Sequence, residues 1–361
     1  MSQTRRTVVV LAAGEGKRMK SATPKVLHPL LGRTLLGHVL TASASAGAER
    51  TIVVVGHKAD QVEAHLAEVA PAATPVLQAE QNGTGHAMRI ALEAVPEATG
   101  TVVVLNGDVP LLRAETVARL IEEHEGGARG ATVLAAEVGD PSGLGRIVRD
   151  AAGNLEKIVE ERDASAEVRA IREINAGIYA FDVASLREAL SKLSTDNDQG
   201  EEYLTDVFGI LASVGHPVGV FVAPDADETL GCNDRAELAR LRALLRDRVN
   251  DAWMRSGVSI LDPATTWIDV TVTLEPDVEI DQNSQLLGET SVAAGAIVGP
   301  DSTLIDSTVG AGAVVLRTHA IGAEIGAEAT VGPFSFLRPG TRLGRKAKVG
   351  GFVETKNAEL V

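Results

Sequence analysis

The first 235 residues alternate short runs of β-branched residues with amphipathic stretches. Residues 7–11, 51–55 and 101–105 are continuously apolar and read TVVVL, TIVVV and TVVVL. Such runs are typical of strands buried on both faces of a parallel sheet, and the intervals between them leave room for crossover helices. Further strands of the same sheet are predicted at 131–138, 177–181 and 218–223. The pattern predicts a Rossmann-like α/β domain over residues 1–235.

A long helical pattern follows this domain and begins at Asp234. Leu238, Leu241, Leu245 and Val249 recur at steps of three or four residues, which places them on one face of a helix. Gly257 follows the end of the pattern. We therefore predict a linker helix over residues 236–257.

Residues 258–361 have a six-residue period of aliphatic positions, with two slips in the spacing. The positions are Ile268, Leu274, Ile280, Leu286, Val292, Val298 and Leu304, then Val309, Val315 and Ile321, then Ile325, Val331, Leu337, Leu343 and Val349. Glycine follows many of them, as at Gly299 and Gly310. One inward aliphatic residue per hexad is the signature of a left-handed parallel β-helix, here of about five coils. A β-sandwich, the alternative, would instead have a period of two.

Composition narrows the possible functions. The chain has 361 residues, enough for about two domains, and 45% of them are hydrophobic. The net charge of −15 argues against a nucleic-acid partner. A single cysteine, Cys232, fits a reducing compartment. The N-terminal apolar run is too short to span a membrane and lacks a cleavage site, so we expect a cytoplasmic protein without a membrane partner.

The string LAAGEGKRMKSATPK, directly after the first predicted strand, suggests a polyphosphate site. Gly14 and Gly16 allow backbone amides to approach an anion, and Lys17, Arg18 and Lys25 supply positive charge. A Walker loop is excluded because Arg18 stands where serine or threonine is required. A dinucleotide fingerprint is excluded because it needs a third glycine, and Met19 occupies that place.

Two further strings carry candidate ligands. In NGDVPLL, Asp108 follows a strand end, where one carboxylate suits Mg²⁺; a simple turn aspartate is the alternative. In QAEQNGTGHAM, Gln78 could read a base edge, and Gly83 and Gly85 would allow contact with a flat ring. An ordinary Asn-Gly turn explains the same glycines. Near residue 233, the sequence alone favours Asn233 as a helix cap.

Taken together, several strings resemble those of one enzyme family. They are LAAGxGxRM, QAEQxGTGHA, NGDVPLL, GxGRIV, INAGI and GCNDR, followed by the hexad region. The order of these strings is similar to that of the bifunctional N-acetylglucosamine-1-phosphate uridylyltransferases/glucosamine-1-phosphate acetyltransferases. The resemblance implies Mg²⁺-dependent transfer of UMP from UTP to N-acetylglucosamine 1-phosphate. The product, UDP-N-acetylglucosamine, would be used to make precursors of cell-envelope polymers of the peptidoglycan and lipopolysaccharide type.

The resemblance also implies residue roles. Arg18 and Lys25 would act on the phosphates, and Asp108 and Asn233 would hold the metal. The nucleotide would be bound by Leu11, Ala12, Ala13, Gly14, Lys25, Gln78, Gly83 and Thr84. The sugar would be bound by Asn106, Gly107, Gly145, Glu160 and Asn175. Asn106 departs from the family, since many relatives carry tyrosine there.

For the second domain, the resemblance implies that Arg338 and Lys356 contact the acetyl acceptor and that the protein is a homotrimer. The pattern stops at Val361, before the family's histidine base, and His319 is the one histidine after residue 257. We therefore expect the acetyltransferase domain to be truncated and acetyl transfer to be lost. A basic cluster, with Glu354 opposing it, faces phosphorylated ligands in the family; a solvated basic face is the alternative. The cluster is Arg338, Arg342, Arg345, Lys346, Lys348 and Lys356.

Two rival functions remain at this level. One is another nucleotidyltransferase with a β-helix tail, such as ADP-glucose or GDP-mannose pyrophosphorylase, and the QAEQxGTGHA string argues against it. The other is a regulatory subunit that has lost its chemistry. The joint presence of Arg18, Lys25, Asp108 and Asn233 argues against that second function.

Overall fold

A computed structural model describes residues 5–360 of the chain, and contacts divide it into two compact units. The first unit runs to His28 and from Thr34 to Leu238, and the second contains Pro29–Arg33 and everything from Ala239 onward. The division therefore falls inside a helix, and a short hairpin early in the chain belongs to the second unit. The three-part division at residues 235 and 257 stays a proposal.

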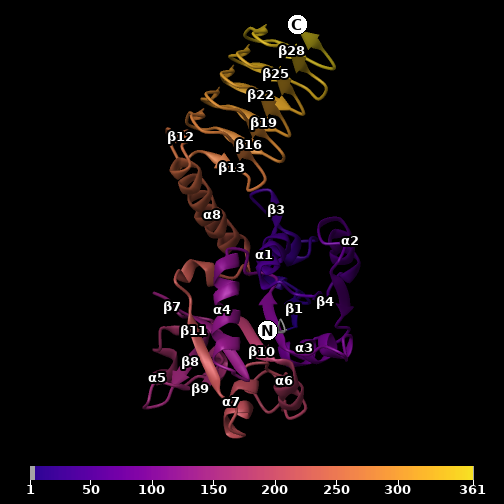
Figure 1. Cartoon of the computed structure of the whole chain (residues 1–361), viewed down its shortest axis with the longest axis vertical. Coiled ribbons are helices and arrows are strands. Elements are labelled where there is room, and N and C mark those ends of the chain that lie inside the picture. Colours follow the sequence, from indigo (N-terminus) through magenta and orange to yellow (C-terminus); the bar gives the residue numbers. More distant parts are fainter. Residues whose placement is uncertain (1–4, 361) are drawn as a thin grey trace. The chain divides into compact units, whose positions relative to one another are not determined.

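The first unit is built on one twisted sheet (Figure 1). Its strand order is β11-β7-β10-β6-β1-β4-β5, with β8 paired to β10 and β9 paired to β8. The strands are β1 (Arg6–Leu11), β4 (Arg50–Val55), β5 (Thr74–Leu77), β6 (Thr101–Asn106), β7 (Ala131–Glu137), β8 (Gly145–Arg149), β9 (Leu155–Val159), β10 (Glu173–Asp182) and β11 (Val218–Val222). All six predicted apolar runs are strands of this sheet.

The central strands are parallel, but β10 is not. β1 pairs in parallel with both β4 and β6, as the sequence predicts. β10 runs antiparallel to both of its neighbours, β6 and β7. Its composition could not reveal this, because any strand buried on both faces is apolar whatever its direction. The sheet is therefore mixed rather than wholly parallel.

Helices cover both faces of the sheet because alternate residues of each strand point to opposite sides. Val8 and Val10 pack with α1, α2 and α4, whereas Val9 packs with α3, α6 and α7. The helices are α1 (Leu35–Ser43), α2 (Ala59–Val69), α3 (Thr84–Glu93), α4 (Ala114–Gly126), α5 (Ala166–Arg169), α6 (Val183–Leu190) and α7 (Asp206–Ser213). Short 3₁₀ turns include η1 (Lys17–Met19), η2 (Lys25–Leu27), η3 (Ala44–Ala46), η4 (Glu161–Asp163) and η5 (Ala226–Thr229). Two aliphatic cores result, one on each face.

The predicted linker helix is α8 (Arg235–Arg255), close to its expected bounds. Asp234 is its N-cap, because its Oδ1 accepts from the backbone N–H groups of Ala236 and Glu237 at 2.8 and 2.9 Å. Near the other end, Val249 and Trp253 pack against the core of the following region. The hairpin strands β2 (Pro29–Leu30) and β3 (Arg33–Thr34) lie earlier in the chain.

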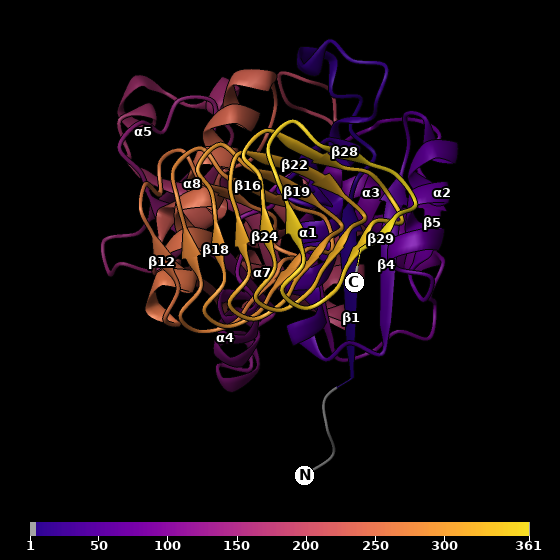
Figure 2. The ribbon, with the colours of Figure 1, turned by 90° about the horizontal axis from the view of Figure 1, so that it is seen from above.

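The second unit is the predicted β-helix (Figures 1 and 2). Over the described residues it has three parallel sheets of six strands each, which makes six coils instead of five. One sheet is β12 (Ser259–Ile260), β15 (Glu279–Ile280), β18 (Ile297–Val298), β21 (Val314–Val315), β24 (Thr330–Val331) and β27 (Lys348–Val349). The second is β13 (Trp267–Ile268), β16 (Gln285–Leu287), β19 (Thr303–Ile305), β22 (Thr318–Ile321), β25 (Ser335–Leu337) and β28 (Glu354–Thr355). The third is β14 (Thr273–Leu274), β17 (Ser291–Val292), β20 (Thr308–Val309), β23 (Glu324–Ile325), β26 (Arg342–Leu343) and β29 (Glu359–Leu360).

One predicted core position of the β-helix is wrong. Ile321 is only half-buried, and Ala320 is the fully buried residue of β22. The register explains the difference, because Leu304 pairs with Ala320 and Ile305 with Ile321. The successive inward residues are therefore Val315, Ala320 and Ile325. The small alanine side chain takes the place where the six-residue period predicts a larger aliphatic one. The other fourteen predicted positions are buried.

Candidate functional site

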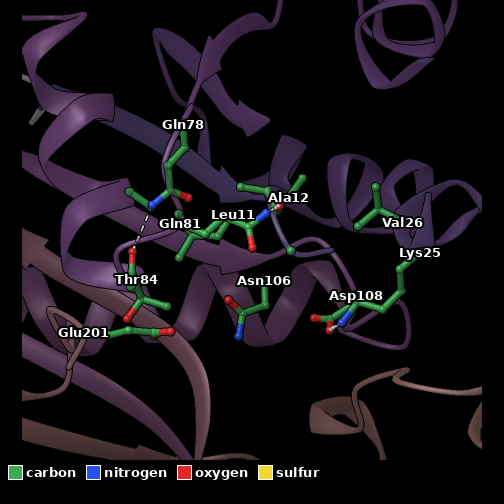
Figure 3. Close-up of a pocket in the computed structure, with 14 residues that line it drawn as sticks. Leu11, Ala12, Lys25, Val26, Gln78, Gln81, Thr84, Asn106, Asp108 and Glu201 are labelled. Carbon is green, nitrogen blue, oxygen red and sulfur yellow. Dashed lines mark hydrogen bonds and ion pairs between the residues drawn. The ribbon is translucent and has the colours of Figure 1, made fainter. Parts of the chain in front are cut away.

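A cavity of about 280 Å³ lies in the first unit, at the carboxyl ends of β1 and β6 (Figure 3). Ligands bind at this edge in open α/β sheets. Its lining includes one predicted sugar residue, Asn106, and the predicted nucleotide and metal residues Leu11, Ala12, Ala13, Gly14, Lys25, Gln78, Gly83, Thr84 and Asp108. Val26, Gln81, Ala87 and Glu201 also line it and were not predicted. Gln81 stands within a quoted string, whereas Glu201 has no local sequence signal.

The loop after β1 contains Gly14, which leaves open space, and Gly16, which packs tightly against a neighbouring side chain. A Cβ placed on Gly14 would meet no atom within 4 Å. A Cβ on Gly16, whose φ is 63°, would lie 2.7 Å from the Lys25 Cβ. Gly16 thus seats the lysine, and Gly14 borders open space. Arg18 lies in η1 with an exposed side chain and is not among the lining residues.

Lys25, Asp108 and Asn233 meet at one end of the cavity. The Lys25 Nζ donates to Asp108 Oδ2 and lies 3.5 Å from Asn233 Oδ1. A backbone hydrogen bond of 2.9 Å from Cys232 N to Asp108 O ties the two segments together. Asn233 does not cap α8, since Asp234 does, so its amide oxygen is available at this point. Burial raises the pKa of the neighbouring Cys232 thiol to about 11, so this thiol stays protonated at neutral pH.

This donor set fits Mg²⁺. An ammonium group already sits between one carboxylate oxygen and one amide oxygen, the oxygen ligands that a hard cation prefers. Among the described residues, no three His, Cys, Asp or Glu side chains converge on one point. A metal held there would therefore complete its coordination with water and substrate phosphates, which is usual for Mg²⁺.

Gln78 lies at the other end of the cavity, with Asn106 between the two ends (Figure 3). The Gln78 side chain is buried, and its Nε2 donates to Gly83 O at 3.1 Å and lies 3.3 Å from His86 Nδ1. These contacts hold the amide plane fixed. A fixed amide can discriminate between bases by hydrogen bonding.

The glycines of this end contact protein atoms. A Cβ on Gly83 would lie 2.4 Å from Glu202 O, and a Cβ on Gly85 would meet Leu193 Cδ1 at 2.4 Å. The Thr84 hydroxyl accepts from the Leu204 backbone N–H at 3.1 Å. Gly83, Gly85 and Thr84 therefore anchor the 201–204 segment beside the cavity, which is how Glu201 reaches it. Gly85 itself is not among the described residues that line the cavity.

The predicted sugar residues form a second group beside the cavity. A Cβ on Gly145 would lie 3.4 Å from both Glu160 Oε2 and Asn175 Cβ. Glu160 accepts from Thr205 Oγ1 at 3.3 Å, and its burial raises the pKa of its carboxyl. The group continues toward the cavity, because Asn106 packs against Gly177, two residues after Asn175. Gly107 is buried beneath Leu11 and does not line the cavity.

In the second unit, the predicted acetyl-acceptor residues directly follow two paired strands of successive coils, since Leu337 pairs with Thr355. Arg338 makes an ion pair of 3.1 Å with Glu354 and lies over the Phe336 ring; Lys356 is exposed. The basic cluster is more nearly neutralised than the sequence suggested. Parallel stacking brings Glu324 to Arg342, and Glu328 to Arg345 and Lys346.

No helix in the described part of the chain is both long and apolar enough to cross a membrane.

Residues 8–255 match the family of MobA-like NTP transferase domains. A protein of Streptomyces avermitilis named "Bifunctional protein GlmU" is 56% identical over 355 residues, which cover 98% of this chain and 74% of that protein. Proteins of the same name from Kineococcus radiotolerans and Corynebacterium aurimucosum are 53% and 51% identical, over 98% of this chain and 72% and 73% of theirs.

Proposed function

Because the chain belongs to the family of bifunctional GlmU proteins and carries a nucleotidyltransferase domain, we propose that it transfers UMP from UTP to N-acetylglucosamine 1-phosphate. The observation that supports this most is one cavity with the Lys25–Asp108 ion pair at one end and the buried Gln78 amide at the other. The sugar group of Gly145, Glu160 and Asn175 adjoins it through Asn106. UDP-N-acetylglucosamine and pyrophosphate are the products, and the sugar nucleotide serves peptidoglycan precursors.

The reaction needs no protein nucleophile, because the sugar phosphate is already anionic. Its oxygen bonds to the α-phosphorus of UTP as the bond to the β-phosphate breaks, and pyrophosphate leaves with the electron pair. Catalysis then depends on positioning and on offsetting negative charge. Lys25 contacts the phosphates from inside the cavity, and Arg18 reaches the leaving pyrophosphate from its exposed position. Asp108 and Asn233 would hold Mg²⁺, which would supply charge stabilisation to the phosphates.

Base selection resides at the Gln78 end. Gln78 presents its carboxamide oxygen to the N3–H of uracil, and the backbone around Gly83 donates to a ring carbonyl. Cytosine lacks the N3–H, and we expect a purine to be too large for this end of the cavity. Polar groups left unpaired by a wrong base disfavour it strongly.

The test is pyrophosphate release by the purified 361-residue chain with N-acetylglucosamine 1-phosphate and each of four nucleoside triphosphates. We expect turnover with UTP that requires Mg²⁺, and turnover with ATP, GTP and CTP lower by about 10²-fold or more. Glucose 1-phosphate serves as the control acceptor. Comparable rates with ATP or GTP would favour a pyrophosphorylase of different specificity, and no release with any of the four would favour a regulatory protein.

The second unit carries proposals that stand apart from this one. Arg338 and Lys356 bind the phosphate of the acetyl acceptor, and the β-helix assembles the protein as a homotrimer. The expected loss of acetyl transfer in the 361-residue chain stays a prediction. The cytoplasm, where UTP is available, is the proposed location.

A further inference from the structure

The least exposed charged side chain near the sugar group is Arg146, which the proposed reaction does not use. It follows Gly145 in β8 and is 1% exposed, and it is one of the largest fully buried side chains among the described residues. It does not line the nucleotide cavity. A guanidinium buried this completely requires partners, because an uncompensated buried charge is strongly destabilising.

The Arg146 guanidinium ties together three segments of the chain. Nη1 donates to Leu144 O, immediately before Gly145. Nη2 donates to Glu161 Oε2 at 2.7 Å and to Arg169 O at 3.2 Å. The Arg169 side chain in turn donates from Nε to Glu161 O at 3.3 Å. The segments joined are therefore the turn before β8, the η4 turn and the end of α5.

Two of these segments adjoin proposed sugar residues: the turn before β8 leads into Gly145, and η4 follows Glu160. Glu161 is the residue after Glu160, so fixing its carboxylate fixes the backbone that presents the Glu160 carboxyl. Arg146 also stands opposite Ile174 in β10, which places Gly145 opposite Asn175. Arg146 is thus linked to all three members of the sugar group, through the chain to Gly145, through Glu161 to Glu160 and through the strand register to Asn175.

Stability does not account for this arrangement. Arg146 Nε is buried without a hydrogen-bond partner among the described residues, so the guanidinium is incompletely satisfied. Well-packed apolar side chains usually replace buried ion pairs without loss of stability. An arginine kept here at that cost is better explained by the geometry that it imposes on neighbouring residues.

We propose that Arg146 is a positioning residue for the sugar phosphate. It holds Glu160 against Gly145 and Asn175 through Glu161, so that the carboxyl meets the sugar hydroxyls in a fixed orientation. This proposal rests on the proposed function. It predicts a loss confined to the sugar substrate, because UTP binds in the cavity that Arg146 does not line.

The experiment uses the full chain and four variants. Arg146→Met removes all three side-chain hydrogen bonds of the guanidinium. Arg146→Lys keeps the positive charge but cannot reach all three partners at once. Glu161→Gln weakens the ion pair from the side of its partly exposed partner. Arg149→Met is the matched control. Arg149 lies on the same strand and pairs with Glu173 at 2.8 and 2.5 Å, and neither residue belongs to the sugar group.

We expect Arg146→Lys and Glu161→Gln to raise KM for N-acetylglucosamine 1-phosphate by about tenfold or more, since small displacements of positioned groups have large effects. KM for UTP should stay within about twofold, and Arg149→Met should change both values by less than about twofold. UTP binding measured by calorimetry without the sugar should match the parent in every variant. Glu161→Gln remains informative even if Arg146→Met fails to fold, because Glu161 is partly exposed.

Parallel rises of both KM values, or an unchanged KM for the sugar phosphate in Glu161→Gln and Arg146→Lys, would overturn the positioning role and leave the proposed function standing. Failure of the proposed function has a different signature. The parent chain would then form no UDP-N-acetylglucosamine from UTP and the sugar phosphate, and both proposals would fall together.

Discussion

His124 should make the first unit lose stability on mild acidification. The side chain lies near the end of α4, is 3% exposed, and pairs through Nδ1 with Thr132 Oγ1 at 3.1 Å. Burial lowers its pKa from 6.5 to about 4, and Arg129 adds to this effect. Glu125 and Asp182 act in the opposite direction but do not offset the burial. The folded state therefore favours the neutral imidazole over the protonated one.

The sign and size follow from proton linkage. Between pH 6.5 and about pH 4, the unfolded chain binds a proton that the folded chain does not, so stability rises with pH across this window. Below about pH 4 both states are protonated and the loss levels off. With these two pKa values, lowering the pH from 7 to 5 should cost about 2 kcal/mol of unfolding free energy.

The assay compares the parent with His124→Gln, whose amide keeps a hydrogen bond to Thr132 but does not titrate. Urea unfolding and hydrogen exchange of the β7 amides, which pack on α4, are measured at pH 7 and pH 5. The pKa of Glu125 is lowered chiefly by its hydrogen bond with Arg6, a cause that both proteins share. The exposed His57, replaced by glutamine, controls for loss of a histidine elsewhere.

We expect the parent to lose about 2 kcal/mol more than His124→Gln between the two pH values, with His57→Gln behaving as the parent. Equal losses in parent and His124→Gln would refute the reasoning. They would mean that the folded protein accommodates the imidazolium, so that burial does not exclude the proton.

Three other outcomes follow from the site and the core. Asp108→Ala should lower uridylyl transfer by about 10²-fold or more at unchanged melting temperature, because a metal ligand is lost; near-parental turnover at limiting Mg²⁺ would contradict this. Lys25→Met should tighten Mn²⁺ binding without nucleotide by about tenfold, measured by calorimetry, because the ammonium no longer competes for Asp108 and Asn233; weaker binding would show that Lys25 does not compete with the metal. Leu304→Ala, at a fully buried coil position, should cost about 2–5 kcal/mol in denaturant unfolding, whereas the exposed Gln285→Ala should cost under about 0.5 kcal/mol.

The strands were predictable because burial on both faces leaves only apolar residues, as at Val8, Val9 and Val10. Their direction was not, since the apolar run of β10, like those of the strands that pair in parallel, indicates burial but not direction. The hexad region was predictable for a related reason: each coil needs one inward side chain per side. The prediction at Ile321 was wrong because the spacing is five residues there and places Ala320 inward. Alanine is frequent throughout this chain, so an inward alanine does not stand out as part of a period.

The ion-pair partners of the charged residues were harder to predict from the sequence. Residues 17 or 18 apart become neighbours only through the coil length, as for Arg342 and Glu324 or Arg345 and Glu328. The sequence placed one acid opposite the basic cluster, and the structure places three there. Exposed pairs of this kind contribute little to stability, but they reduce the local positive potential. A phosphorylated ligand therefore meets a weaker positive field than the count of lysines and arginines implies.

The glycines of the motifs show most clearly where sequence reasoning about a site ends. A glycine pattern indicates that a Cβ would be in the way, but not what it would strike. At Gly83 that atom is the Glu202 carbonyl oxygen, at Gly16 the Lys25 side chain, and at Gly177 the Asn106 amide. At these three positions the absent side chain makes room for the protein itself, and Gly14 alone of the motif glycines in the cavity lining faces unfilled space. The direct backbone approach of a phosphate is therefore better assigned to Gly14, and the other three glycines make room for residues at or beside the proposed site.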